Sequence, residues 1–206
     1  MSKITVIEPE KSYTFAEYFK LNCEPDDLLA YFGYGYETKS LTLPQSKREL
    51  NRLENLKQQL EQNLPYISLT SEMARREFLI APVLMEVIYY TKARVKVGYS
   101  LTVSEQLKGE LDYYLQSQSQ LLVIEAKNAD IQRGFTQLAV ELIAVSQAQL
   151  AKGDILYGAV SVGNIWQFAV LHSQEQQVVQ DLNLYRVPAD LQELLPIIVG
   201  ILELDL

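Results

Sequence analysis

The stretch KGELDYYLQSQSQLLVIEAKNAD, residues 108–130, decides the predicted fold. It contains two segments typical of buried sheet, with charged residues at the start of the first segment and at the end of the second. Apolar and aromatic residues dominate 111–115 and 121–126, and both runs have the length of β-strands. Side chains two positions apart on a strand point to the same side, so Glu125 and Lys127 share one face of the sheet. The stretch therefore predicts a β-hairpin that gathers charge at one end.

The turn of this hairpin fixes which residues face each other. A turn centred on 118–119 places Asp112 opposite Glu125, and in the same register Glu110 lies opposite Lys127. Two acids directly opposite on a sheet repel each other unless a cation lies between them, and a divalent metal would satisfy both. The alternative is a solvated face on which Glu110 pairs with Lys127 and Asp112 is merely exposed. The other face is apolar and is predicted to enter the core with Leu111, Tyr113, Leu115, Leu122, Ile124 and Ala126.

Composition limits the class of protein. The chain has 206 residues, 48% of them hydrophobic, which suits one globular domain or one domain with a helical extension. No apolar run approaches the roughly 18 residues of a membrane span, and the first residues lack the apolar segment of a signal peptide, so we expect a cytoplasmic protein without a membrane partner. Cys23 and His172 are the only residues of their types, which excludes a cysteine or histidine metal cluster. A metal would be held mainly by oxygen ligands.

Charge argues against one mode of nucleic-acid binding. The formal net charge of −8 opposes a protein that coats nucleic acid through its overall field, but it leaves room for a local basic groove. Each patch is otherwise explained as ordinary solvated surface. Two groups of cations are candidates for such a groove: Lys47, Arg48 and Arg52, and Lys92, Arg94, Lys96 and Lys108.

Helical periodicity precedes the hairpin. Residues 46–63 carry leucines three and four positions apart, which predicts a helix whose apolar stripe packs on its own domain or on a second copy of the chain. A further helix is capped at Thr70 or Ser71, and Pro82 kinks or breaks it. Residues 12–36 indicate two short helices and a turn.

The pattern after the hairpin mixes both periods. Asp130 is placed to cap a helix that runs to about residue 151. Strands are then predicted over 155–162, 165–173 and 177–185, and a closing helix follows Pro188. The predicted fold class is α/β, or α+β, with a central mixed sheet flanked by helices.

The order of these elements resembles a known superfamily. An acid-bearing strand, a hairpin, an E-x-K sequence at the end of an apolar strand and a polar-capped helix follow one another, as in the PD-(D/E)XK nucleases, which include restriction endonucleases. The resemblance covers roughly 71–171, and its specific parts are GELDY, 109–113, and VIEAK, 123–127. It implies a restriction endonuclease-like core over 67–206, preceded by a helical amino-terminal extension over 1–66.

The resemblance also implies a chemistry. Asp112, Glu125 and the carbonyl of Ala126 would hold Mg²⁺, with Mn²⁺ as a substitute. Lys127 would orient the attacking water and stabilise charge on the phosphate. The activity would be endonuclease or exonuclease cleavage of nucleic acid, with DNA as the expected partner and a homodimer as a possible assembly. Leu111 stands where the superfamily name has proline.

Two further segments agree with this resemblance. SEMARREFLIAPVL, 71–84, is similar to the first core helix of the nuclease domain in type I restriction subunits, where a glutamate and an arginine recur. Glu72 is the matching acid and would complete a second metal site, with Glu77 as the second choice. Gln137 and Glu141 occupy the place of a Q-x-x-x-Y motif, with glutamate instead of tyrosine. Gln137 would orient the motif lysine or contact a phosphate.

Two other functions compete with the nuclease. A non-catalytic module that retains the nuclease fold would bind nucleic acid or protein, although such a module has no need of both Asp112 and Glu125. A structural protein with an accidental motif would bind no metal. Metal binding and cleavage therefore separate the three classes.

Overall fold

The computed structural model describes residues 7–118, 120–127 and 130–204. Its strands are β1 Gly35–Lys39, β2 Arg94–Thr102, β3 Lys108–Gln116, β4 Leu121–Ala126, β5 Ile155–Ser161, β6 Ile165–His172, β7 Gln177–Asp181 and β8 Tyr185–Arg186. Its α-helices are α1 Phe15–Tyr18, α2 Pro25–Tyr31, α3 Leu53–Asn63, α4 Glu72–Arg75, α5 Ala81–Thr91, α6 Ile131–Gln147 and α7 Leu191–Glu203. A 3₁₀ turn, Leu64–Tyr66, follows α3, and a π-helical segment, Arg76–Ile80, joins α4 to α5.

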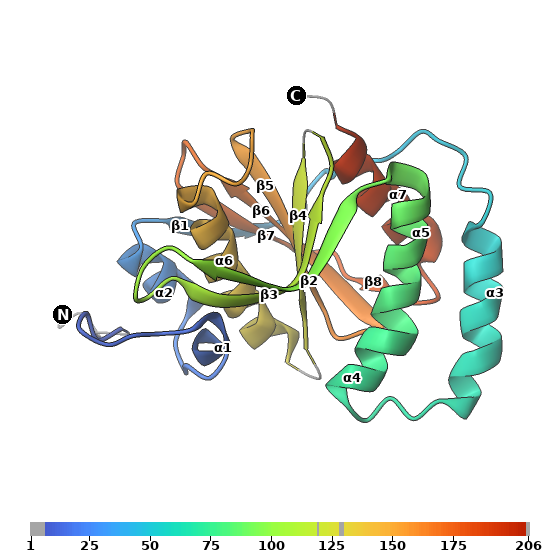
Figure 1. Ribbon diagram of the computed structural model, residues 1–206, viewed down its shortest axis with the longest axis horizontal. Coiled ribbons are helices and arrows are strands. Elements are labelled where there is room, and N and C mark those ends of the chain that lie inside the picture. Colours follow the sequence, from blue (N-terminus) through green and yellow to red (C-terminus); the bar gives the residue numbers. More distant parts are fainter. Residues whose placement is uncertain (1–6, 119, 128–129, 205–206) are drawn as a thin grey trace.

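All eight strands form one mixed sheet, in the order β1-β7-β6-β5-β4-β3-β2 with β8 paired to β6 (Figure 1). Strands β4 and β5 are parallel and are joined through α6, whereas β2, β3 and β4 are antiparallel neighbours. Helices α3, α5 and α7 lie on one side of the sheet, and α1, α2 and α6 lie on the other. The predicted α/β class with a mixed sheet flanked by helices is confirmed.

The hairpin has the predicted register. Tyr113 pairs with Ile124 and Leu115 with Leu122, and Ser117 N donates to Gln120 O across the turn at 2.9 Å. The expected turn centre includes Ser119, which lies outside the described residues. Of the six residues predicted for one apolar face, five lie together in the core under α5 and α7: Tyr113, Leu115, Leu122, Ile124 and Ala126.

The prediction is wrong for Leu111, which packs in the other core together with Tyr114. Its neighbour Asp112 lies opposite Gly98, where the ladder between β2 and β3 lacks a pair and Gly98 takes a φ of +61°. Only glycine adopts that conformation without strain, so the irregularity is built into the sequence. It turns β3 at the position of Asp112.

The helix after Ser71 is interrupted as predicted. Ser71 Oγ accepts a hydrogen bond from Ala74 N at 3.1 Å and caps α4. The π-helical segment directly precedes α5 and its Pro82, which has no N–H to donate to the preceding helical turn. A π-helical turn shifts the side chains around the helix axis, and such turns are common at functional sites. Arg76 is its first residue.

The amino-terminal part contributes to both cores. The two short helices expected over 12–36 are α1 and α2, but β1 was not predicted and pairs in parallel with β7. The apolar stripe of α3 is buried against its own chain through Leu53, Leu56 and Leu60. A division at residue 66 remains a prediction from the sequence. Across the described ranges, no helix is long and apolar enough to cross a membrane.

Candidate active site at the end of β4

The predicted site residues come together because α6 crosses the end of β4. Gly134 makes this approach possible, since a Cβ there would lie 2.8 Å from Val160 Cγ1 and 3.1 Å from Lys127 Cγ. Asp130 begins the helix, and its side chain accepts a hydrogen bond from Arg133 N at 3.1 Å, as predicted for the cap. The helix ends at Gln147, before the expected residue 151.

Lys127 and Glu125 form an ion pair. Lys127 Nζ contacts Glu125 Oε1, and their side chains are 13% and 1% exposed. The Lys127 backbone is fixed by its N–H, which donates to Ser161 O at 2.8 Å. The ammonium also lies 5.2 Å from the centre of the Phe19 ring. Burial lowers the pKa of Lys127, but Glu125 more than offsets this and the net shift is upward, so the side chain stays cationic.

Asp112 is held by a different cation. Arg76 Nη1 donates to Asp112 Oδ1 at 2.9 Å, and Ala126 N donates to Asp112 Oδ2 at 2.9 Å. Arg76 also lies 5.0 Å from the centre of the Tyr113 ring. The solvated face, with Glu110 paired to Lys127 and Asp112 merely exposed, is therefore wrong. Arg76 was not predicted as a site residue, although an arginine recurs in the nuclease helix that 71–84 resembles.

Two carboxyl groups of the site are completely buried. Gln137 Nε2 donates to Glu141 Oε1 at 2.8 Å, and both side chains belong to the buried face of α6. Burial raises the pKa of Glu141 to about 8. Burial also raises the pKa of Glu125 well above its usual range, and the charges of Glu141 and Asp112 add to this shift. Burial therefore favours the protonated form of both glutamates more than it would in the unfolded chain.

Several of these oxygens lack hydrogen-bond donors. Apart from the ion pair with Lys127, neither oxygen of Glu125 accepts a hydrogen bond from any described residue, and the same holds for Glu141 Oε2. Buried polar atoms are normally satisfied, because losing water without a replacement costs about 1–3 kcal/mol for each group. The oxygens therefore suit a ligand that brings positive charge.

The site fits a metal only in part. Carboxylate oxygens are the ligands that Mg²⁺ prefers, and Glu125 offers an oxygen without a donor. However, within the described parts of the chain no three His, Cys, Asp or Glu residues are grouped closely enough to hold an ion. Each of the two acids is instead paired with one of the protein's own cations, Asp112 with Arg76 and Glu125 with Lys127.

A cavity of about 490 Å³ gives access to this site. Lys127 lines it together with Glu72, so the structure brings the first choice for the additional acid near the motif lysine. Glu77, the second choice, is exposed and does not line this cavity. Lys20 adds a further cation to the wall, and Arg133 lines the cavity as an ion pair with Asp130. An anionic substrate in this cavity would meet Lys127, whereas Glu125 is fully buried and does not line the cavity.

Comparisons with known proteins found no match, whether to a family model, a curated protein or a solved structure. The function must therefore be argued from the chemistry of the site. Sequence reasoning identified Asp112, Glu125, Lys127 and Gln137, and the structure places all four within one cluster at the end of β4. Ala126 lies between Glu125 and Lys127, with its side chain in the opposite core.

Proposed function

We propose that the chain is a Mg²⁺-dependent nuclease that hydrolyses phosphodiester bonds of DNA in the cytoplasm, with a restriction endonuclease-like core. The observation that carries this proposal is the pair of buried, incompletely bonded carboxyl groups, Glu125 and Glu141, beside Lys127. A purely structural strand end would be more stable with apolar residues in their place. Perturbed acids beside a cation and a cavity are typical of catalytic sites.

Each residue has a role in this proposal. Asp112, Glu125 and the carbonyl of Ala126 would hold the ion, and Glu72 is near enough to the cavity to take part in a second position. The bound ion would polarise a phosphoryl oxygen and make its water more acidic. Lys127 stays cationic and lines the cavity, so it can stabilise the charge that develops on the phosphate.

Gln137 is a positioning residue in this proposal. It donates to Glu141 Oε1, which holds that carboxyl of α6 near Glu125, and it does not line the cavity. The expectation that Gln137 contacts a phosphate is therefore less favoured than an orienting role. One site in each chain would nick DNA as a monomer and cut both strands as a symmetric dimer.

The first test is cleavage of supercoiled plasmid, linear duplex, single-stranded DNA and RNA with Mg²⁺ or Mn²⁺. We expect Asp112→Asn and Glu125→Gln to abolish cleavage and weaken Mn²⁺ binding in calorimetry. Glu110→Gln is the matched control, because Glu110 is exposed on the same strand as Asp112. If the two variants bind Mn²⁺ as tightly as the parent, the assigned metal site is wrong.

A second variant separates chemistry from binding. Lys127→Ala should keep metal affinity and most DNA binding, while single-turnover cleavage under saturating Mn²⁺ falls by about 10² to 10³. The reason is that only the transition state concentrates extra charge beside this side chain. Lys127→Arg should be impaired as well, since a planar guanidinium does not reproduce an ammonium. Equal rates in parent and variant would remove Lys127 from the mechanism.

One observation favours a non-catalytic binding module as the second candidate. The ion pairs of Arg76 with Asp112 and of Lys127 with Glu125 neutralise both motif acids with the protein's own cations. This alternative predicts nucleic-acid binding with neither cleavage nor Mn²⁺ uptake. An absence of both metal and nucleic-acid binding would instead indicate a structural protein.

A further inference from the structure

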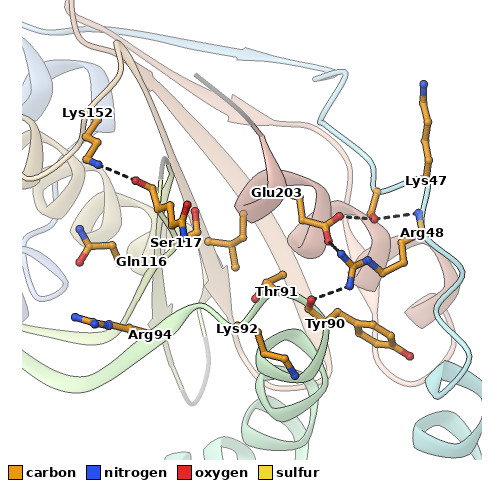
Figure 2. Close-up of a pocket in the computed structure, with 13 residues that line it drawn as sticks. Lys47, Arg48, Tyr90, Thr91, Lys92, Arg94, Gln116, Ser117, Lys152 and Glu203 are labelled. Atoms are coloured by element: carbon orange, nitrogen blue, oxygen red, sulfur yellow. Dashed lines mark hydrogen bonds and ion pairs between the residues drawn. The ribbon is translucent and has the colours of Figure 1, made fainter.

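A second cavity, of about 940 Å³, lies at the other end of the hairpin and is rich in positive charge (Figure 2). It is lined by Ser117 and Gln118 of the turn between β3 and β4, by the end of α5 and by the end of α7. Glu203 is the one acid among the described residues that line this basic cavity. Five cations also line it: Lys47, Arg48, Lys92, Arg94 and Lys152.

The fold brings together two groups of cations that are far apart in the sequence. Lys47 and Arg48 precede α3, whereas Lys92 directly follows α5 and Arg94 begins β2. Lys152 follows α6 on the other side of the cavity (Figure 2). The chain has a net charge of −8, so this group of cations makes one region of the surface positive in a protein that is negative overall.

Most of this charge is not neutralised within the protein. Arg48 alone is paired with a carboxylate, through Nη2 to Glu203 Oε1 at 2.7 Å. Lys92 and Lys152 donate only to backbone carbonyls, those of Tyr89 and Gln118. Lys47 and Arg94 are exposed and make no hydrogen bond or ion pair with the described part of the chain. Four cations therefore remain available to an anion.

The lining also indicates which kind of anion. Among its described residues Tyr90 is the one aromatic side chain, and it is buried, with its hydroxyl donating to Asn51 Oδ1. No ring is thus offered on which a base could stack, and the remaining neutral polar groups are hydroxyls and amides, beside the buried Leu202. Such a surface contacts phosphates and carries no sequence information.

We propose that the basic cavity binds the phosphate backbone of nucleic acid, as a contact separate from the candidate active site. Gln116 lines the basic cavity and Asp112 belongs to the candidate active site, and both lie on β3. They are four residues apart, which separates the two sites by roughly 13 Å along the strand. The basic cavity therefore holds nucleic acid in place independently of the acids at the far end of the hairpin. This proposal does not rest on the nuclease activity, because it concerns binding without metal.

The test is fluorescence anisotropy with a labelled 30-base-pair duplex in EDTA, comparing the parent with Lys47→Gln/Arg94→Gln. Each lost phosphate contact lowers the slope of log K against log salt by about 0.9. When salt rises from 50 to 200 mM, the fold-loss of affinity should therefore be about ten times smaller for the double variant than for the parent. Lys39→Gln/Lys57→Gln is the control, since it removes the same charge outside the basic cavity.

The outcomes are distinct. Weaker binding with a reduced slope in the cavity variant alone supports the proposal, and single-stranded DNA and RNA arms identify the preferred nucleic acid. Equal effects of both double variants would show a response to overall charge and overturn it, as would the absence of duplex and single-strand binding at low salt. Binding of pyrophosphate or ATP without nucleic acid would reassign the cavity to small phosphates. If the parent binds nucleic acid through the basic cavity but cleaves none with Mg²⁺ or Mn²⁺, only the nuclease proposal is contradicted.

Discussion

Arg76 and Asp112 show how one side chain decides the state of the proposed metal site. The Arg76 guanidinium donates a hydrogen bond to Oδ1 of Asp112. The two side chains are 25% and 20% exposed, so solvent screens the pair only in part. A metal that uses Asp112 has to compete with this charge. The competition distinguishes a metal site from a permanent ion pair.

We predict that Arg76→Met raises Mn²⁺ affinity. Removing a competing interaction of about 1 kcal/mol should strengthen binding about fivefold, measured by calorimetry at constant salt. Arg75→Met is the matched control, since the adjacent guanidinium donates to Leu69 O and Val162 O and does not contact Asp112. Unchanged or weaker Mn²⁺ binding in the Arg76 variant would place the metal, if one binds, away from Asp112.

At the scale of an element, the close packing of α7 on the segment before α3 gives a sharp prediction. Ser46 N donates to Pro196 O at 2.9 Å, and a Cβ on Gly200 would lie 2.6 Å from Ser46 N and 2.7 Å from the carbonyl carbon of Gln45. These are backbone atoms, so no side-chain rotation relieves the clash. Gly200→Ala should lower the free energy of unfolding by about 2 kcal/mol, despite the better helix propensity of alanine.

Urea denaturation measures this change, and Gln192→Ala, on the exposed side of α7, should stay within about 0.5 kcal/mol of the parent. Stability that rises in the Gly200 variant would show that the contact between α7 and residues 45–46 does not form as described. Because Ser46 lines the basic cavity, the variant should also weaken nucleic-acid binding.

The same scale shows what the sequence can predict. The register of the hairpin follows from alternation and turn length, because a shift by one residue would bury Asp112 among apolar side chains. Strand β1 was missed, since its residues are mostly exposed and its partner β7 lies about 140 residues away along the chain. Arg76 was missed for a similar reason: its partner lies on another element, and periodicity does not report contacts between elements.

At the scale of the whole molecule, the buried acids should make stability depend on pH. The pKa of Glu141 is raised by burial from 4.5 to about 8, and the pKa of Glu125 is raised as well. Between these values the folded protein binds more protons than the unfolded chain. Stability contributed by the pair is therefore present at low pH and is lost as pH rises toward 8.

We predict that, in EDTA, the free energy of unfolding falls by about 2 kcal/mol between pH 5.5 and pH 8, within the limit of about 1.4 kcal/mol per pH unit for one proton. Glu141→Gln should remove more than half of this fall, because a neutral amide at that position also relieves Glu125 of a neighbouring charge. Glu54→Gln, an exposed change on α3, should leave the fall unchanged. Urea denaturation at several pH values measures all three proteins. A parent whose stability is constant or rises over this range would show that folding does not raise the pKa values of the two glutamates. The acids at the end of β4 would then titrate as ordinary carboxyl groups, and the nuclease proposal would lose the observation that carries it.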